Sequence, residues 1–88
     1  EDFTIIRYNT PYTYASLIVT IFDRFGRRVR KLVDGEVVNG KGELVYDGRD
    51  DSGTPLKIGI YIFLAEFSDK ESGTTKSIKA AFVIARRL

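Results

Sequence analysis

Apolar residues recur with a period of two along three stretches of the chain, residues 17–22, 59–67 and 78–85. A period of two places successive side chains on opposite faces of an extended segment, so each stretch is predicted to be a β-strand. In the first stretch Leu17, Val19 and Ile21 share one face, and the residues of the other face are also largely apolar. A strand that is apolar on both faces is expected at the centre of a sheet.

The other two long stretches predict an apolar row that faces the core and a second row that faces outward. In residues 59–67 the first row is Tyr61, Phe63, Ala65 and Phe67, and the second is Ile60, Ile62 and Leu64. In residues 78–85 the first row is Ile78, Ala80, Phe82 and Ile84, and the second is Lys79, Ala81, Val83 and Ala85.

Shorter alternating segments predict further strands at residues 3–8, 27–33 and 43–46. Turn-forming pairs separate the segments: Phe25-Gly26, Asp34-Gly35, Asn39-Gly40, Asp47-Gly48, Ser52-Gly53 and Ser72-Gly73. No window shows the 3.6-residue period of an amphipathic helix, and the apolar residues are mainly β-branched or aromatic. Six or seven short strands with frequent turns predict an antiparallel β-sandwich or a small barrel, and we favour the sandwich.

Size and composition limit the functions that the chain can carry. Its 88 residues are expected to form one domain, residues 1–88, with roughly 64% of the unfolded chain's surface buried on folding. It contains no Cys and no His, which removes disulfides, thiolate chemistry and the usual general base, so we expect no enzyme and no cofactor. A net charge of +2 is too small to hold nucleic acid, and no apolar run approaches the roughly 20 residues that span a membrane.

The acidic loop at residues 47–53 is the first candidate for a ligand site, because three carboxylates in five residues could hold Ca²⁺. Its spacing departs from a calcium-binding loop, since Arg49 and Ser52 occupy the third and sixth positions. We therefore favour carboxylates that cap turn amides, and calcium binding stays open. An acid/base pair at Asp50 and Asp51 is disfavoured, because no apolar pocket is evident to raise one pKa.

Two further clusters each allow a functional and a structural interpretation. Five cations lie within eight residues: Arg24, Arg27, Arg28, Arg30 and Lys31. They could bind phosphates, with Phe25 as a stacking face, but we favour the solvent side of an edge strand for Arg28 and Arg30. The tyrosines Tyr8, Tyr12 and Tyr14 could form a sugar-stacking platform, although rings packed at the rim of the core are more common.

Several motifs occur in order along the chain. Residues 21–33 read IFDRFGRRVRKLV, residues 40–53 read GKGELVYDGRDDSG, and Pro55-Leu56, Gly59-Ile60-Tyr61 and a basic end at residues 79–87 follow. Together they resemble bacterial immunoglobulin-like C-terminal domains, with Tyr46 in place of the family's usual Trp. The resemblance implies an all-β, immunoglobulin-like antiparallel sandwich of about seven strands. It also implies that residues 1–88 are the C-terminal module of a larger exported bacterial protein.

The resembled group includes the sorting domains of type IX secretion cargo and the immunoglobulin-like domain of the flagellar hook-capping protein. For a sorting domain, the resemblance implies partner recognition through Gly59, Tyr61 and Lys79. Our leading hypothesis is therefore a non-catalytic sorting or attachment module at the cell surface or in the medium, read by the secretion machinery. An assembly or spacer module is the alternative, with Ile60, Ile62 and Leu64 buried against a sister chain or a neighbouring domain. Carbohydrate binding through the tyrosines is the third possibility.

Overall fold

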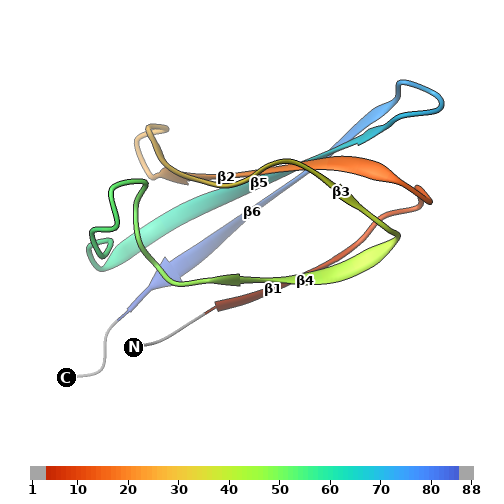
Figure 1. Cartoon of the computed structure of the whole chain (residues 1–88). Helices are drawn as coiled ribbons and strands as arrows, with labels where there is room; N and C mark the ends of the chain where they lie inside the picture. The colour runs from red at the N-terminus through yellow and green to blue at the C-terminus, as the bar shows by residue number, and fades with distance from the viewer. Residues whose placement is uncertain (1–3, 86–88) are drawn as a thin grey trace.

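Six β-strands arranged in two antiparallel sheets make up the described part of the fold (Figure 1). The computed structural model describes residues 4–85. The strands are β1 (Thr4–Asn9), β2 (Ala15–Asp23), β3 (Arg28–Val38), β4 (Lys41–Tyr46), β5 (Gly59–Asp69) and β6 (Thr75–Ile84). One sheet has the order β3-β2-β5-β6 and the other pairs β1 with β4. The described part of the chain contains no helix, so the all-β sandwich predicted from the sequence is confirmed.

Each predicted strand is present, and most extend beyond their predicted ends. The short candidate at residues 27–33 continues to Val38, and the one at residues 43–46 begins at Lys41. The candidate at residues 3–8 becomes β1, although Phe3 lies outside the described residues. The sequence predicted about seven strands, and within residues 4–85 there are six.

The core lies between the sheets and is built from the rows that the alternation predicted. Leu17, Val19 and Ile21 of β2 are at most 1% exposed, and Phe67 of β5 is equally buried. The remaining buried apolar residues are Ala15, Val33, Tyr46, Leu56, Tyr61 and Ala65. Each large aliphatic side chain removed from water in this way contributes about 1.5–3 kcal/mol to folding. Strand β2 lies between β3 and β5, as the apolar residues on both of its faces predicted.

Strand β3 departs from simple alternation because its ladder with β2 contains three register shifts. The sequence predicted a turn at Asp34-Gly35, and this prediction is wrong because Gly35 lies inside β3. Gly35 is the unpaired residue of one shift, since Ile18 faces Asp34 and Leu17 faces Glu36. Its φ of 84° lies in the left-handed region, where glycine is not strained. A glycine bulge therefore replaces the predicted turn and keeps the strand in the sheet.

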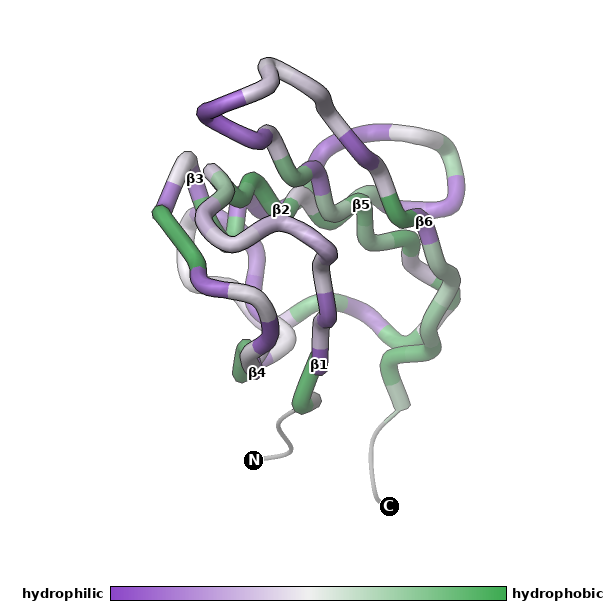
Figure 2. Tube along the Cα trace, turned by 90° about the vertical axis from the view of Figure 1, so that its right-hand side faces the viewer, coloured by the Kyte–Doolittle hydropathy of each residue, from purple (hydrophilic) through white to green (hydrophobic). Residues whose placement is uncertain are grey.

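The two-stranded sheet is narrower than the sheet on which it packs. Figure 2 shows β4 and β1 as a lower layer, below an arc that runs from β3 through β2 and β5 to β6. The chain passes between the layers at the turn after β3, and β3 and β4 are in contact there. Strand β1 pairs with β4 along one edge only, which leaves its other edge on the side of β6.

Candidate protein-interaction surface

The outer face of the four-stranded sheet carries a continuous apolar patch. Its central row is Ile60, Ile62 and Leu64 of β5, as the alternation predicted. The ladder places Ile62 between Phe22 of β2 and Ala81 of β6, and it places Ile60 beside Val83. Ile60 is 55% exposed and Val83 is 65% exposed, so the patch faces outward. We call the residues Ile18, Phe22, Ile60, Ile62, Leu64, Ala81 and Val83 the outer patch.

Charged residues border the outer patch, and those on the β3 side are paired. Arg28 Nε lies 3.8 Å from Asp51 Oδ2, and Lys31 Nζ lies 3.3 Å from Asp34 Oδ1. These carboxylates offset the positive charge of the strand next to the patch, although exposed pairs of this kind add little stability. Glu66 of β5 and Lys79 of β6 lie on the same face and form no ion pair with the described residues.

The acidic loop is held by its own carboxylates, as the capping interpretation predicted. Asp50 Oδ1 accepts hydrogen bonds from the amides of Ser52, at 3.0 Å, and Thr54, at 2.9 Å. Asp51 Oδ1 accepts one from the amide of Lys31 at 2.9 Å, which ties the loop to β3. The Thr54 amide is the main cause of an Asp50 pKa below its ordinary value. These oxygens already stabilise turns, and residues 4–85 contain no group of three or more metal-ligating side chains placed to hold an ion.

Arg30 is a structural clamp, and the prediction that it lines the solvent side of the edge strand is wrong. Its Nη1 donates to Asp47 Oδ1 at 3.4 Å, to the carbonyl of Arg49 at 3.1 Å and to that of Asp50 at 3.4 Å. The guanidinium also lies over the Tyr46 ring, 5.9 Å from its centroid. A register shift causes this, because Arg30 faces the inward Ile21 while Arg28 faces the outward Phe22.

The other residues of the basic cluster do not form a phosphate-binding stripe. Asp23 accepts hydrogen bonds from Arg27 Nε at 2.9 Å and from the backbone amides of Arg27 and Phe25. Gly26, with a φ of 84°, completes this turn. Arg24 lies over the exposed Phe25 ring, 4.8 Å from its centroid. The cations are therefore spread over a turn, a clamp and the border of the outer patch, and the edge position of β3 is confirmed.

The three N-terminal tyrosines do not share one surface. Tyr8 packs against Phe67 with ring centroids 5.7 Å apart, and Tyr12 is partly buried against the core. Tyr14 is 57% exposed. A sugar-stacking platform needs its aromatic faces open on one side, and the structure does not bring these rings together in that way. The interpretation of Tyr8 and Tyr12 as rings at the rim of the core is confirmed.

The three residues implied for partner recognition lie on β5 and β6, but not on one face. Tyr61 is 8% exposed, and its hydroxyl donates to the carbonyl of Lys57 at 2.8 Å. Gly59 begins β5 opposite Ile84, and its added Cβ would meet the Tyr61 ring only at 4.0 Å. Lys79 is exposed and pairs with Leu64, three positions further along the ladder and on the outward side. Of the three, Lys79 has its side chain where a partner could reach it.

Sequence reasoning missed two features that matter for this surface. It did not predict that Val83 and Phe22 lie on the same face as the central aliphatic row, although alternation within their own segments indicated that they face outward. It also missed the contact between Gly42 and Tyr8: a Cβ on Gly42 would lie 2.7 Å from Tyr8 Cζ. Only the pairing of β1 with β4 brings those two residues together.

Comparisons with known proteins agree with the fold. A model of the FlgD Ig-like domain family matches residues 4–71. The crystal structure of FlgD from P. aeruginosa is similar over 93% of this chain, with 26% sequence identity and a TM-score of 0.73. The chain spans 61% of the length of that FlgD chain. No curated protein matches.

These matches bear on the hypotheses drawn from the sequence. The resemblance to the immunoglobulin-like domain of the hook-capping protein is confirmed. The comparisons lend no support to the sorting role, and they fit the alternative of a structural module better. Residues 4–85 include no helix suited to crossing a lipid bilayer.

Proposed function

The chain belongs to the FlgD Ig-like domain family, and on this basis we propose that it is a non-catalytic structural module of a hook-capping type of assembly. In this proposal the module acts outside the cell membrane, its partners are other protein subunits, and residues 1–88 form one unit of a larger protein. The single observation that carries it is the outer patch, an exposed apolar surface on the four-stranded sheet.

The outer patch has the size that a protein interface requires. From the exposed fractions of its residues we estimate on the order of 400 Å² of apolar surface, within the range of functional patches on single proteins. A standard interface takes about 800 Å² from each partner, of which about 56% is apolar, so each side supplies roughly 450 Å² of apolar area. The patch therefore supplies most of the apolar area that one side of an ordinary interface needs.

A second copy of the chain is the occupant that the charges favour. The cations of β3 beside the patch are already paired with Asp34 and Asp51, so they do not repel an identical face. Glu66 and Lys79 carry opposite charges on that face and form no ion pair with the described residues. Glu66 of one copy can therefore pair with Lys79 of the second copy, and Lys79 of the first with Glu66 of the second. In this arrangement Lys79 keeps the partner-recognition role predicted for it. Gly59 and Tyr61 have structural roles in β5 instead.

Light scattering after size-exclusion chromatography tests this proposal. We expect concentration-dependent dimers that Ile60→Asp abolishes, because a carboxylate on the buried patch would be desolvated without a partner. Val45→Asp is the matched control, since Val45 is 61% exposed on the other sheet and should leave the dimer intact. A chain that is monomeric at all concentrations up to millimolar, or one whose dimer is lost equally in both variants, would contradict the proposal.

A further inference from the structure

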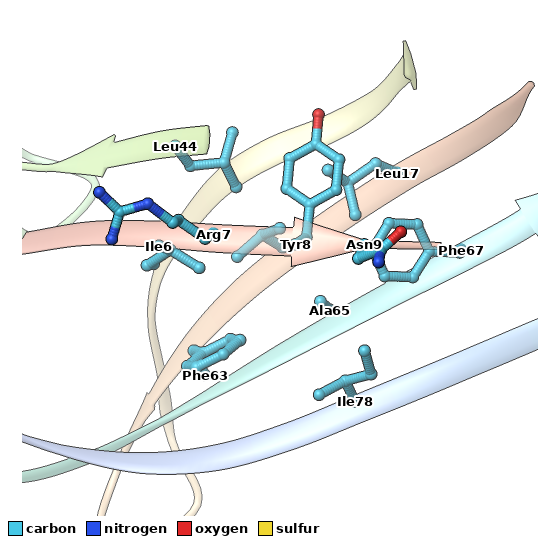
Figure 3. A pocket seen from close by; sticks show the side chains of 11 residues that line it. Ile6, Arg7, Tyr8, Asn9, Leu17, Leu44, Phe63, Ala65, Phe67 and Ile78 are labelled. Carbon is cyan, nitrogen blue, oxygen red and sulfur yellow. The ribbon is translucent and has the colours of Figure 1, made fainter. Parts of the chain in front are cut away.

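An open apolar seam runs between the free edge of β1 and strand β6. One pocket of about 90 Å³ is lined by residues of β1, β2, β4, β5 and β6. Figure 3 shows Ile6 on β1 facing Phe63 and Ala65 of β5 and Ile78 of β6. A second pocket, of about 250 Å³, continues the seam past Ile6 and Phe63 to Phe82. Ile78 is 39% exposed there although it belongs to the inward row of β6.

The backbone of β1 offers unused hydrogen-bonding groups along this seam. In an antiparallel ladder, opposite residues alternate between pairs that exchange hydrogen bonds and pairs that do not. The Thr10 amide donates to the carbonyl of Gly40 at 2.7 Å, so the bonded pairs continue at Tyr8 with Gly42 and at Ile6 with Leu44. The amides and carbonyls of the intervening residues Ile5, Arg7 and Asn9 consequently point away from β4. Among the described residues no strand pairs with that edge.

We propose that this seam accepts a β-strand from a partner protein, in which apolar side chains alternate with carboxylates. The added strand would pair with Ile5, Arg7 and Asn9 through the backbone and would place its apolar side chains over Phe63 and Ile78. Recognition by strand addition takes its affinity from main-chain hydrogen bonds and its specificity from alternate side-chain pockets. The added strand would widen the β1–β4 sheet to three strands.

Charge identifies the chemistry of the partner strand. Arg7 is exposed beside the free edge and Lys41 faces Asn9 across the ladder. Lys76 is exposed and lies on the same side of β6 as Ile78. Strands β1 and β4 and the inward side of β6 carry three cations near these pockets and one carboxylate, Glu43. Glu43 Oε2 lies 3.7 Å from Arg7 Nε. The seam therefore has a positive rim that complements carboxylates.

The same charges disfavour a second copy at this edge. Antiparallel pairing of β1 with another β1 would bring Arg7 close to its own counterpart. Pairing with β6 would add Lys76 and Lys79 to a rim that is already positive. Like charges opposite each other on neighbouring strands are destabilising. This site lies on the flank of the molecule away from the outer patch and goes beyond the function proposed above, so the two can fail separately.

A synthetic peptide provides the test. The probe is a seven-residue peptide blocked at both ends, with valine at odd positions and glutamate at even positions, labelled for fluorescence anisotropy. We expect saturable binding to the domain and weaker binding of the same peptide with lysine in place of glutamate. Backbone amide exchange should slow at Ile5, Arg7 and Asn9 when the glutamate peptide is bound, but not at Val45.

Proline variants separate backbone pairing from charge. Arg7→Pro removes an amide that faces the seam and spares the ladder with β4, because proline is tolerated on an open edge. It should weaken peptide binding at least tenfold, whereas Arg7→Gln should weaken it about two- to threefold. Val45→Pro is the matched control, since its amide by the same alternation points away from β1, and it should bind as the wild type does.

A side-chain pair makes the test independent of whether Arg7→Pro folds. Ile78→Lys adds a charge inside the seam and should also weaken binding at least tenfold, while Val83→Lys on the opposite face of β6 should leave it unchanged. Absence of peptide binding at millimolar concentration would overturn the proposal, as would equal binding by Arg7→Pro and Val45→Pro. Dimers lost in Arg7→Pro but retained in Ile60→Asp would assign the seam to a second copy and overturn it too.

Discussion

The hydroxyl of Tyr46 should make the stability of the domain depend on pH in alkaline solution, and Tyr46→Phe should remove that dependence. The residue is 1% exposed, and its hydroxyl donates a hydrogen bond of 2.8 Å to the carbonyl of Arg49. Burial, opposed in part by the nearby guanidinium of Arg30, raises the pKa of Tyr46 from its ordinary value of 10.0 to about 12. The folded protein therefore holds this proton more tightly than the unfolded chain does.

The size of the effect follows from the two pKa values. A pKa that is higher in the folded state stabilises the fold fully below pH 10, and this contribution is lost as the pH rises toward 12. By pH 11.5 the loss is on the order of 2 kcal/mol in the free energy of unfolding. At pH 7, Tyr46→Phe should cost about 1 kcal/mol, because the Arg49 carbonyl still accepts a hydrogen bond from Arg30.

Urea unfolding followed by far-ultraviolet circular dichroism measures both effects. The wild type should be more stable than Tyr46→Phe at pH 7, and this advantage should disappear or reverse by pH 11.5. Tyr14→Phe is the matched control, because Tyr14 is 57% exposed, and its stability should follow that of the wild type throughout. If the wild type and Tyr46→Phe lose stability in parallel from pH 9 to pH 11.5, the argument from burial is refuted.

Two further predictions concern the pairing of β1 with β4 and the turn that follows β2. Gly42→Ala should lower the free energy of unfolding by about 1–3 kcal/mol because its Cβ would meet the Tyr8 ring, and in a Tyr8→Ala background the same change should cost far less. Urea unfolding of the four proteins measures this, and equal costs in both backgrounds would contradict the steric explanation. The Arg27 amide is the main cause of an Asp23 pKa below its ordinary value of 3.8, so Asp23 stabilises the fold above that pH and loses its effect as the pH falls. Acid unfolding should consequently be shallower in Asp23→Asn between pH 4 and pH 2, and identical slopes would refute the assignment.

The sequence predicted the sandwich because inward-facing and outward-facing side chains alternate regularly along its long strands. Leu17, Val19 and Ile21 form the buried row of β2 as predicted, and Ile60 lies on the outward row of β5. Alternation is a local signal, and it identifies the face of a residue only while the register is unbroken. The alternating segments number six, as do the strands of residues 4–85, and the expectation of about seven strands came from the family resemblance.

The clamp formed by Arg30 could not be predicted for the same physical reason. Its position relative to Val29 and Arg28 suggested a solvated edge, but the register shift in β3 turns it toward Tyr46. That shift depends on pairing with β2, which alternation within β3 does not contain. The seam between β1 and β6 likewise depends on which strands end up next to each other. The outer patch was predicted in part, because its central row belongs to a single strand.

The sheet order β3-β2-β5-β6 has a consequence for how the chain reaches this structure. Strands β2 and β3 are neighbours in sequence, as are β5 and β6, so each hairpin can form locally within about 1–10 μs. The ladder between β2 and β5 must close a far longer loop, and the chain loses that entropy before the central contacts stabilise it. We therefore expect docking of the two hairpins to be slower than formation of either one, and we expect changes along the β2–β5 ladder to alter the folding rate.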